Sequence, residues 1–114
     1  MKINRYLEMA IILSRNQKPI QKRYSLAAVG VRSDGAVVFS VNGNPFEPEI
    51  KHHAEGRLVR KLDFGSVVYV ARTTKDKKAA MSKPCRGCQI VMRSIGVYKC
   101  IYTISDREFG VMYL

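Results

Sequence analysis

The sequence predicts a single α/β domain in which helices pack on the faces of one mixed five-stranded sheet. The chain has 114 residues, the length of one domain. Hydrophobic residues make up 46% and charged residues 25%, a balance typical of a globular protein with its own core. Helical and strand patterns follow one another over 1–114 in the order α-β-β-α-β-α-β-β. This alternation favours one sheet covered by helices over separate all-α and all-β parts.

The boundaries of the elements follow from apolar periodicity and from turn residues. The expected helices are 2–15, 52–62 and 84–96, the last of which begins with Pro84 and ends at Gly96. The expected strands are 24–32, 37–41, 66–72, 97–103 and 108–114. We expect segment 73–83 to be a basic, irregular loop.

The last two strands must form an antiparallel hairpin. Only a few residues lie between Thr103 and Glu108. A parallel crossover needs about a dozen residues or more, so there is no room for one.

The N-terminal segment reads as an amphipathic helix of a chain without a membrane span. Arg5 and Glu8 interrupt its apolar run and no small-residue cleavage site follows, so we expect neither a signal peptide nor a membrane partner. This leaves the cytoplasm as the expected location. The side chains expected on or near the buried face are Tyr6, Leu7, Ala10, Ile11, Leu13 and Ser14.

The cysteines indicate metal chemistry rather than disulfides. The chain has three, Cys85, Cys88 and Cys100, and an odd number without a signal peptide argues against a secreted disulfide framework. Cys85 and Cys88 form a Cys-x-x-Cys pair at an expected helix start, where free N–H groups and the positive end of the helix dipole favour thiolates. Such a pair is a compact two-thiolate metal site.

A third donor comes from the short stretch His52-His53-Ala54-Glu55. One imidazole and two thiolates give three ligands of a tetrahedral zinc, and the fourth position stays open for water, as in catalytic sites. His53, Cys85 and Cys88 are therefore the expected ligands, with Glu55 as the proton-carrying residue. A closed structural site would need a fourth protein donor, from His52 or Cys100. We reject both, because His52 points about 100° away from His53 on a helix and Cys100 reads as a small hydrophobe in mid-strand.

His-x-Glu followed by Pro-Cys-x-x-Cys, each at a predicted helix start, resembles the signature of the cytidine deaminase-like superfamily. The stretch Lys22-Arg23-Tyr24-Ser25 with the apolar strand after it resembles the opening strand of the free-nucleoside deaminases of that superfamily. The expected hairpin resembles the branch that holds nucleoside and blasticidin deaminases and many toxin deaminases. The resemblance implies a five-stranded sheet and zinc ligands from two helix starts. Nucleoside deaminases of this branch are usually tetramers, so homo-oligomerisation is expected.

The resemblance also implies a reaction and a set of substrate contacts. Zinc activates water for attack on C4 of a cytosine base, and Glu55 moves the protons so that uracil and ammonia form. The implied substrate contacts are Asn42, Asn44, Phe46, Ala54 and Pro84. Asn44 falls where nucleoside deaminases often carry a glutamate for the ribose. Phe46 either stacks on the base or fills the core.

The net charge of +11 leaves the carrier of the cytosine open. Lys83 and Arg86 flank Cys85 and are candidate phosphate contacts, within a basic loop that also holds Arg72, Lys75, Lys77 and Lys78. A second basic run, 15–23, either extends this charge or faces water. Three functions follow: a deaminase of a cytosine nucleoside or nucleotide, which we favour; a deaminase of single-stranded DNA or RNA; and a non-catalytic, zinc-stabilised module that binds nucleic acid.

Overall fold

The computed structural model describes residues 4–16, 24–41, 54–74 and 76–114. The elements in chain order are α1 (Arg5–Arg15), β1 (Tyr24–Val31), β2 (Val37–Val41), α2 (Ala54–Leu58), the 3-10 helix η2 (Val59–Lys61), β3 (Val67–Thr74), β4 (Ala79–Ala80), α3 (Arg86–Ile95), β5 (Lys99–Thr103) and β6 (Phe109–Tyr113). This succession confirms the predicted order of helices and longer strands. Within the described ranges, no helix is long and apolar enough to cross a membrane.

The strands form one mixed sheet in the order β2-β1-β3-β5-β6, with the two-residue β4 paired to β3. β1 runs antiparallel to β2 and to β3, whereas β3 and β5 are parallel. β5 and β6 are antiparallel, with Lys99 opposite Tyr113 and Thr103 opposite Phe109. This pairing confirms the hairpin required by the short connection after Thr103.

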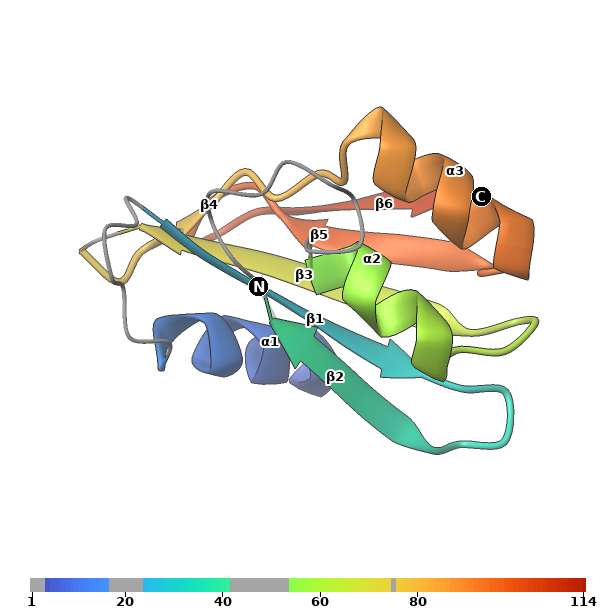
Figure 1. The fold of residues 1–114 in the computed structure, drawn as a ribbon. Coiled ribbons are helices and arrows are strands. Elements are labelled where there is room, and N and C mark those ends of the chain that lie inside the picture. Colours follow the sequence, from blue (N-terminus) through green and yellow to red (C-terminus); the bar gives the residue numbers. More distant parts are fainter. Residues whose placement is uncertain (1–3, 17–23, 42–53, 75) are drawn as a thin grey trace.

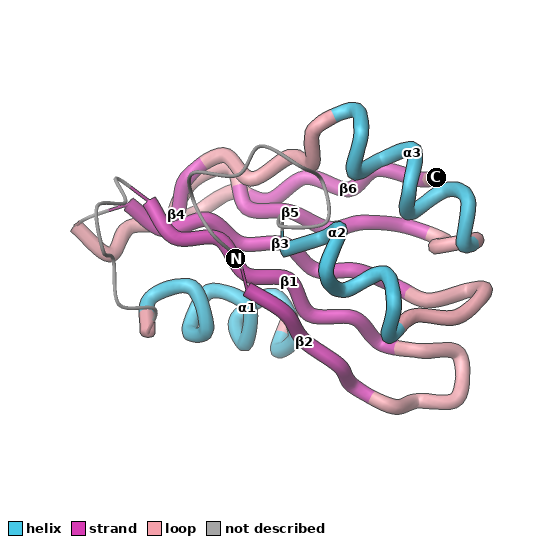
Figure 2. The backbone as a smooth tube through the Cα atoms, viewed as in Figure 1, coloured by secondary structure: helices cyan, strands magenta, loops and turns pink. Residues whose placement is uncertain are grey.

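The sheet lies between two helical layers. Figure 1 shows α1 on one face and α2 and α3 side by side on the other, and the tube in Figure 2 shows that α2 and α3 begin toward the same end of the sheet. The core cluster on the α1 face consists of Leu7, Ala10, Ile11, Val29, Tyr69, Ala71 and Ile101. The cluster on the α2 and α3 face consists of Ala28, Ala54, Leu58, Val68, Val70, Met92, Val97 and Cys100.

The helices end where capping chemistry allows. α1 begins three residues later than expected, because the Asn4 side chain caps it by accepting a hydrogen bond from the Tyr6 N–H (2.8 Å). α3 ends at Gly96, whose φ of 93° lies in the left-handed region that glycine adopts without strain. The second helix is regular only from Ala54 to Leu58 and then tightens into η2. The Leu62 N–H closes that last turn on the Val59 oxygen (3.2 Å).

The structure corrects the expectation of an irregular loop over 73–83. β3 continues to Thr74, and a tight turn with Lys77 at a φ of 67° leads into β4. Buried Thr73 suits a strand and bonds the Ser14 hydroxyl (3.1 Å), which explains the extension. Lys77 donates to the Arg15 oxygen (2.7 Å), so this cation binds the end of α1 and is not free to meet a substrate.

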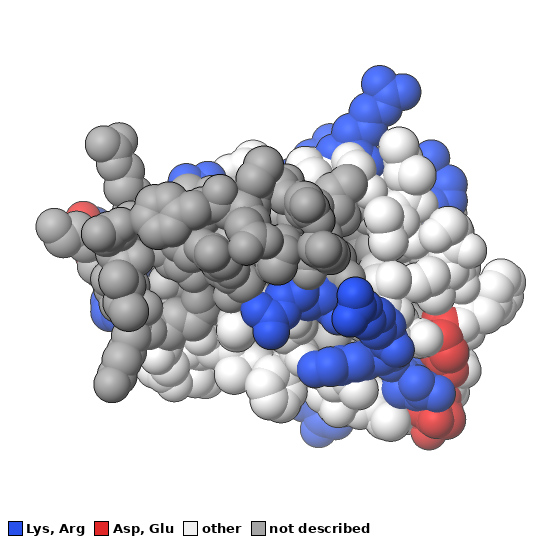
Figure 3. Space-filling view, in the orientation of Figure 1, with Lys and Arg blue, Asp and Glu red and all other residues white. Residues whose placement is uncertain are grey.

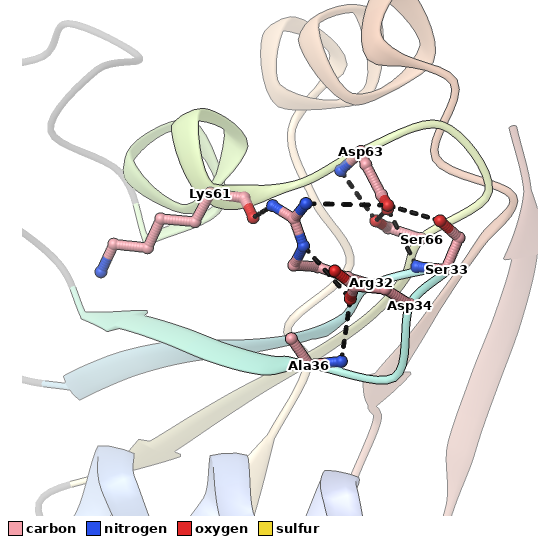
Figure 4. A network of polar contacts seen from close by, with 7 residues as sticks. All are labelled: Arg32, Ser33, Asp34, Ala36, Lys61, Asp63 and Ser66. Carbon is pink, nitrogen blue, oxygen red and sulfur yellow. Dashed lines mark hydrogen bonds and ion pairs between the residues drawn. The ribbon is translucent and has the colours of Figure 1, made fainter.

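A polar network fixes the far end of α2 and η2 to the β1–β2 turn (Figure 4). The Asp63 carboxylate accepts hydrogen bonds from the Ser33 hydroxyl, from the Ser66 hydroxyl (2.6 Å) and from the Ser33 N–H (3.0 Å). Arg32 lies 3.9 Å from the same carboxylate and donates to the Lys61 oxygen (2.9 Å). The hydrogen bonds from Ser33 and Ser66 lower the pKa of Asp63 to about 2, because they favour the ionised carboxylate. The network thereby anchors the chain that leads from η2 into β3.

Candidate metal centre

Two of the three expected zinc ligands lie together at the start of α3. Cys85 is the N-cap residue, in extended conformation with φ −64° and ψ 162°, and its side chain is exposed. Cys88 lies in the first helical turn and is fully buried. Cys85 is the N-cap and Cys88 the third helical residue, and side chains at these two positions face each other across the first turn in capping motifs. One donor faces solvent and the other faces the protein.

Hydrogen bonds fix this first turn. The Gln89 N–H donates to the Cys85 oxygen (3.0 Å), which is the first helical bond of α3. The Gln89 side-chain amide donates to the Pro84 oxygen (2.8 Å), one residue before the cap. Pro84 fits here because it needs no hydrogen-bond partner for its own nitrogen. These two hydrogen bonds fix the backbone at Pro84 and Cys85 relative to the first turn of α3.

The segment that leads into α3 is attached to the sheet by two buried hydroxyl groups. The Ser82 hydroxyl accepts the Thr103 N–H (2.8 Å) and lies 2.9 Å from the Val70 oxygen. The Thr103 hydroxyl donates to the Ala80 oxygen (2.7 Å) and accepts the Arg72 N–H (3.3 Å). β3, β4 and β5 thus meet at the carboxyl ends of the parallel strands, where the segment Ser82-Lys83-Pro84 turns into the helix.

Sequence reasoning missed Ser82 and Thr103. The sequence signal that could have indicated Ser82 is its position two residues before Pro84, in the segment that connects the sheet to the helix. A residue before proline is biased toward extended backbone, so the peptide groups of this segment need partners outside a helix. A nearby hydroxyl is one way to supply them.

The start of α2 packs against α3. Ala54 and Leu58 are fully buried in the same core cluster as Met92, which lies one helical turn after Cys88. Figure 1 shows the two helices beginning over the same part of the sheet. The described starts of α2 and α3 therefore lie over one region of the sheet.

The described residues include only part of the predicted site. Cys85, Cys88, Lys83, Pro84 and Arg86 are described; Glu55 is described only as part of helix α2. The predictions for the other site residues lie outside the described ranges: Asn42, Asn44, Phe46, His52 and His53. In the part of the chain that the structure describes, no three His, Cys, Asp or Glu side chains gather into a metal-binding group.

The third cysteine occupies the position expected of a small hydrophobe. Cys100 is fully buried in β5, in the core cluster between the sheet and the α2 and α3 helices. Its environment is aliphatic, with Val68 and Met92 in the same cluster. This burial confirms the prediction of a small hydrophobe in mid-strand, and the exclusion of Cys100 from the metal site stays a prediction.

The described half of the site fits zinc by its donor chemistry. Zinc prefers thiolate and imidazole donors in tetrahedral sites, and a pair of cysteines at a spacing of three is the usual two-thiolate unit. Cys85 and Cys88 provide that unit on a backbone held by Gln89. Lys83 and Arg86, on either side of Cys85, are exposed and place positive charge beside it.

Comparison with known proteins identifies the fold. No family model and no curated protein matches the chain. Among solved structures, cytidine deaminase from Burkholderia pseudomallei matches with a TM-score of 0.70 and 18% identity, over 99% of this chain and 93% of that one. The Mycobacterium leprae cytidine deaminase matches with a TM-score of 0.60 and 15% identity, over 96% and 94%. For the Mycobacterium tuberculosis enzyme the values are 0.58 and 16%, over 90% and 87%. At such identities the likeness establishes architecture, and this chain has the cytidine deaminase-like fold.

Proposed function

We propose that the protein is a zinc-dependent hydrolytic deaminase that converts cytosine to uracil, the cytosine being carried by a nucleoside or nucleotide. The observation that carries the proposal is the Cys85–Cys88 pair, one exposed and one buried, at the start of a helix packed beside α2. The solved structures that share this fold are named cytidine deaminases. A thiol pair at this point of this fold supports metal chemistry on a cytosine base.

In this proposal His53, Cys85 and Cys88 hold the metal. Zinc, when bound, would lower the pKa of a water molecule toward ~7, so that the water is a nucleophile at neutral pH. Glu55 takes a proton from the attacking water and passes it to the ring nitrogen. The second proton of the same water passes from the new hydroxyl on C4 to the exocyclic amine, so that the C–N bond breaks, ammonia leaves and the carbonyl of uracil forms. One water is consumed for each ammonia released.

The remaining substrate contacts complete the proposal. Asn42 and Asn44 bind the sugar or the base edge, and Phe46 stacks on the base. Ala54 and Pro84 are buried, so backbone groups rather than side chains of these residues would meet the base. The Pro84 oxygen already accepts from Gln89 and retains its second lone pair for an amine donor.

The test measures metal content and turnover together. Purified protein is assayed for zinc by mass spectrometry, and for ammonia release with cytidine, deoxycytidine and their monophosphates. We expect about one zinc per chain and conversion of at least one of these compounds. Glu55→Gln should retain zinc and lose turnover by about a hundredfold or more. Ser94→Ala, an exposed position late in α3, is the control and should retain both.

Two results would contradict the proposal. Turnover that survives in Glu55→Gln would remove the assigned proton carrier. A protein that binds zinc yet converts neither these compounds nor cytosine in single-stranded DNA or RNA would be the non-catalytic module instead.

A further inference from the structure

We propose that exposed cations on α2, on η2 and around the start of α3 form a docking surface for the backbone of a single-stranded polynucleotide, so that a cytosine within a strand, as well as one in a free nucleotide, reaches the deaminase site. We call this surface the basic face and define it as Arg57, Arg60, Lys83 and Arg86. The inference rests on the proposed function, because it names what carries the base into the same site. It goes beyond that function in assigning to the basic face the phosphates on both sides of a target base within a strand.

The side chains of the basic face are available to a ligand. All four are exposed, and none takes part in an ion pair among the described residues. Among the described residues, the ion pairs near this surface join Arg32 to Asp34 and Asp63, at the far end of η2. Figure 3 shows blue side chains over the α2 and α3 side, with red at the lower right and in a small spot at the left edge.

Other cations of this protein differ from the basic face, because they donate hydrogen bonds to backbone oxygens of the protein itself. Lys61, next to Arg60, donates to the Phe39 oxygen (2.9 Å) and lies over the Phe39 ring. Lys77 and Arg15 hold each other's backbone oxygens across two elements. Members of the basic face make no comparable contact with the residues that the structure describes. Their charge is therefore directed to solvent, at the cost of mutual repulsion in a chain of net charge +11.

The placement of the cations distinguishes a strand from a mononucleotide. Lys83 and Arg86 flank Cys85 at the start of α3, whereas Arg57 and Arg60 follow the start of α2. The proposed metal site lies between these two helix starts. A nucleoside monophosphate carries one phosphate and could use only one of the two pairs. A nucleotide within a strand has a phosphate on its 5′ side and another on its 3′ side, which suits both pairs.

Arg57 and Arg60 are also spaced to follow a backbone. Arg57 lies in α2 and Arg60 in η2, and residues three apart lie on one side of the axis in both α-helical and 3-10 geometry. The two side chains can thus contact successive phosphates along the backbone of one nucleic-acid strand.

The test measures binding without relying on turnover. The probe is a fluorescein-labelled single strand of about 12 nucleotides, as DNA and as RNA of the same sequence, titrated with the zinc-loaded full chain and followed by anisotropy. Each phosphate neutralised on a single strand contributes about −0.7 to the slope of log K against log salt, so four cations predict about −2.8. Affinity should then fall about fiftyfold between about 50 and 200 mM salt.

Matched variants locate the surface. Arg57→Gln combined with Arg60→Gln should halve the slope to about −1.4 and weaken binding at low salt by at least about tenfold. Arg5→Gln combined with Lys99→Gln removes the same charge from the α1 side of the sheet and should leave the slope near that of the wild type. Far-UV circular dichroism checks that each variant is folded.

The outcomes separate this inference from the proposed function. Deamination of a cytosine mononucleotide without binding of either strand would overturn the docking surface and leave the deaminase intact. Equal strand affinity in the two double variants would do the same. A protein whose strand binding follows the predicted slope and variant pattern, yet releases no ammonia, supports the surface and refutes the deaminase. Preference for DNA or RNA identifies which strand the surface takes.

Discussion

Replacement of Ser82 by alanine tests the account of how the metal-binding helix is held. The Ser82 side chain is 4% exposed and lies between β3 and β5. Its hydroxyl accepts the Thr103 N–H at 2.8 Å, at the point where the β3–β5 pairing has already ended at Tyr102. The same hydroxyl lies 2.9 Å from the Val70 oxygen and 2.8 Å from the Thr103 hydroxyl.

The expected loss of stability follows from these contacts. Alanine leaves the Thr103 N–H buried without its acceptor, which costs about 1–3 kcal/mol. The hydroxyl proton also loses its acceptor, for about a further 1 kcal/mol. We therefore expect Ser82→Ala to lower the free energy of unfolding by about 3 kcal/mol, or the melting temperature by roughly 12 °C at about 4 °C per kcal/mol. A loss of this size is large for one hydroxyl group.

The assay is urea unfolding followed by far-UV circular dichroism, since the chain has no tryptophan. The midpoint should fall while the slope of the transition stays constant, which shows a change in stability rather than in compactness. Ser94→Ala is the matched control, because its hydroxyl bonds the Val91 oxygen on the exposed side of α3 and its loss should cost less than about 0.5 kcal/mol. A Ser82→Ala midpoint equal to that of Ser94→Ala would refute the reasoning.

Three further predictions concern the metal, the pH response and a turn. Cys88→Ser should lose zinc in mass-spectrometric analysis while Cys100→Ala retains it, and equal zinc content in both would contradict the ligand assignment. Asp63→Asn should destabilise the protein at about pH 6, and the difference from wild type should shrink as pH falls from about 4 to 2. The sign follows because the folded pKa of Asp63, about 2, lies below its unfolded value, so the ionised carboxylate stabilises the fold above the unfolded pKa and loses this effect as pH falls. Urea midpoints of the variant and the wild type that differ by the same amount at about pH 6 and about pH 2 would contradict this. Gly96→Ala should lower the melting temperature more than Gly35→Ala. Both glycines have φ near 90°, but only at Gly96 would a Cβ meet an aromatic ring, that of Phe64. Equal melting temperatures of the two variants would contradict this.

Most of the fold could be predicted because it depends on local patterns. The antiparallel β5–β6 pair followed from the short connection after Thr103, and the buried face of α1 followed from periodicity. β4 could not be predicted, because two alanines in a lysine-rich segment carry no strand pattern. Its position depends on distant partners, such as the Asp106 carboxylate that accepts the Ala79 N–H (2.6 Å).

The candidate site also has one part that the sequence predicts and another that it does not. Cys85 and Cys88 could be found from the sequence, because a metal site needs particular atoms at a particular spacing. Ser82 and Thr103 could not, because their hydrogen bond joins residues 21 positions apart and hydroxyls occur throughout the chain. Sequence thus indicates the donors more readily than the contacts that hold them.

X-ray absorption at the zinc edge of the purified protein tests the central claim most directly. His53, Cys85 and Cys88 predict two sulfur neighbours at about 2.3 Å, with one imidazole nitrogen and one water oxygen near about 2.0–2.1 Å. Cys88→Ser should reduce the sulfur count or abolish the signal. A shell with three sulfurs or with four protein donors, or a chain that takes up no zinc at all, would contradict an open catalytic metal site in this protein.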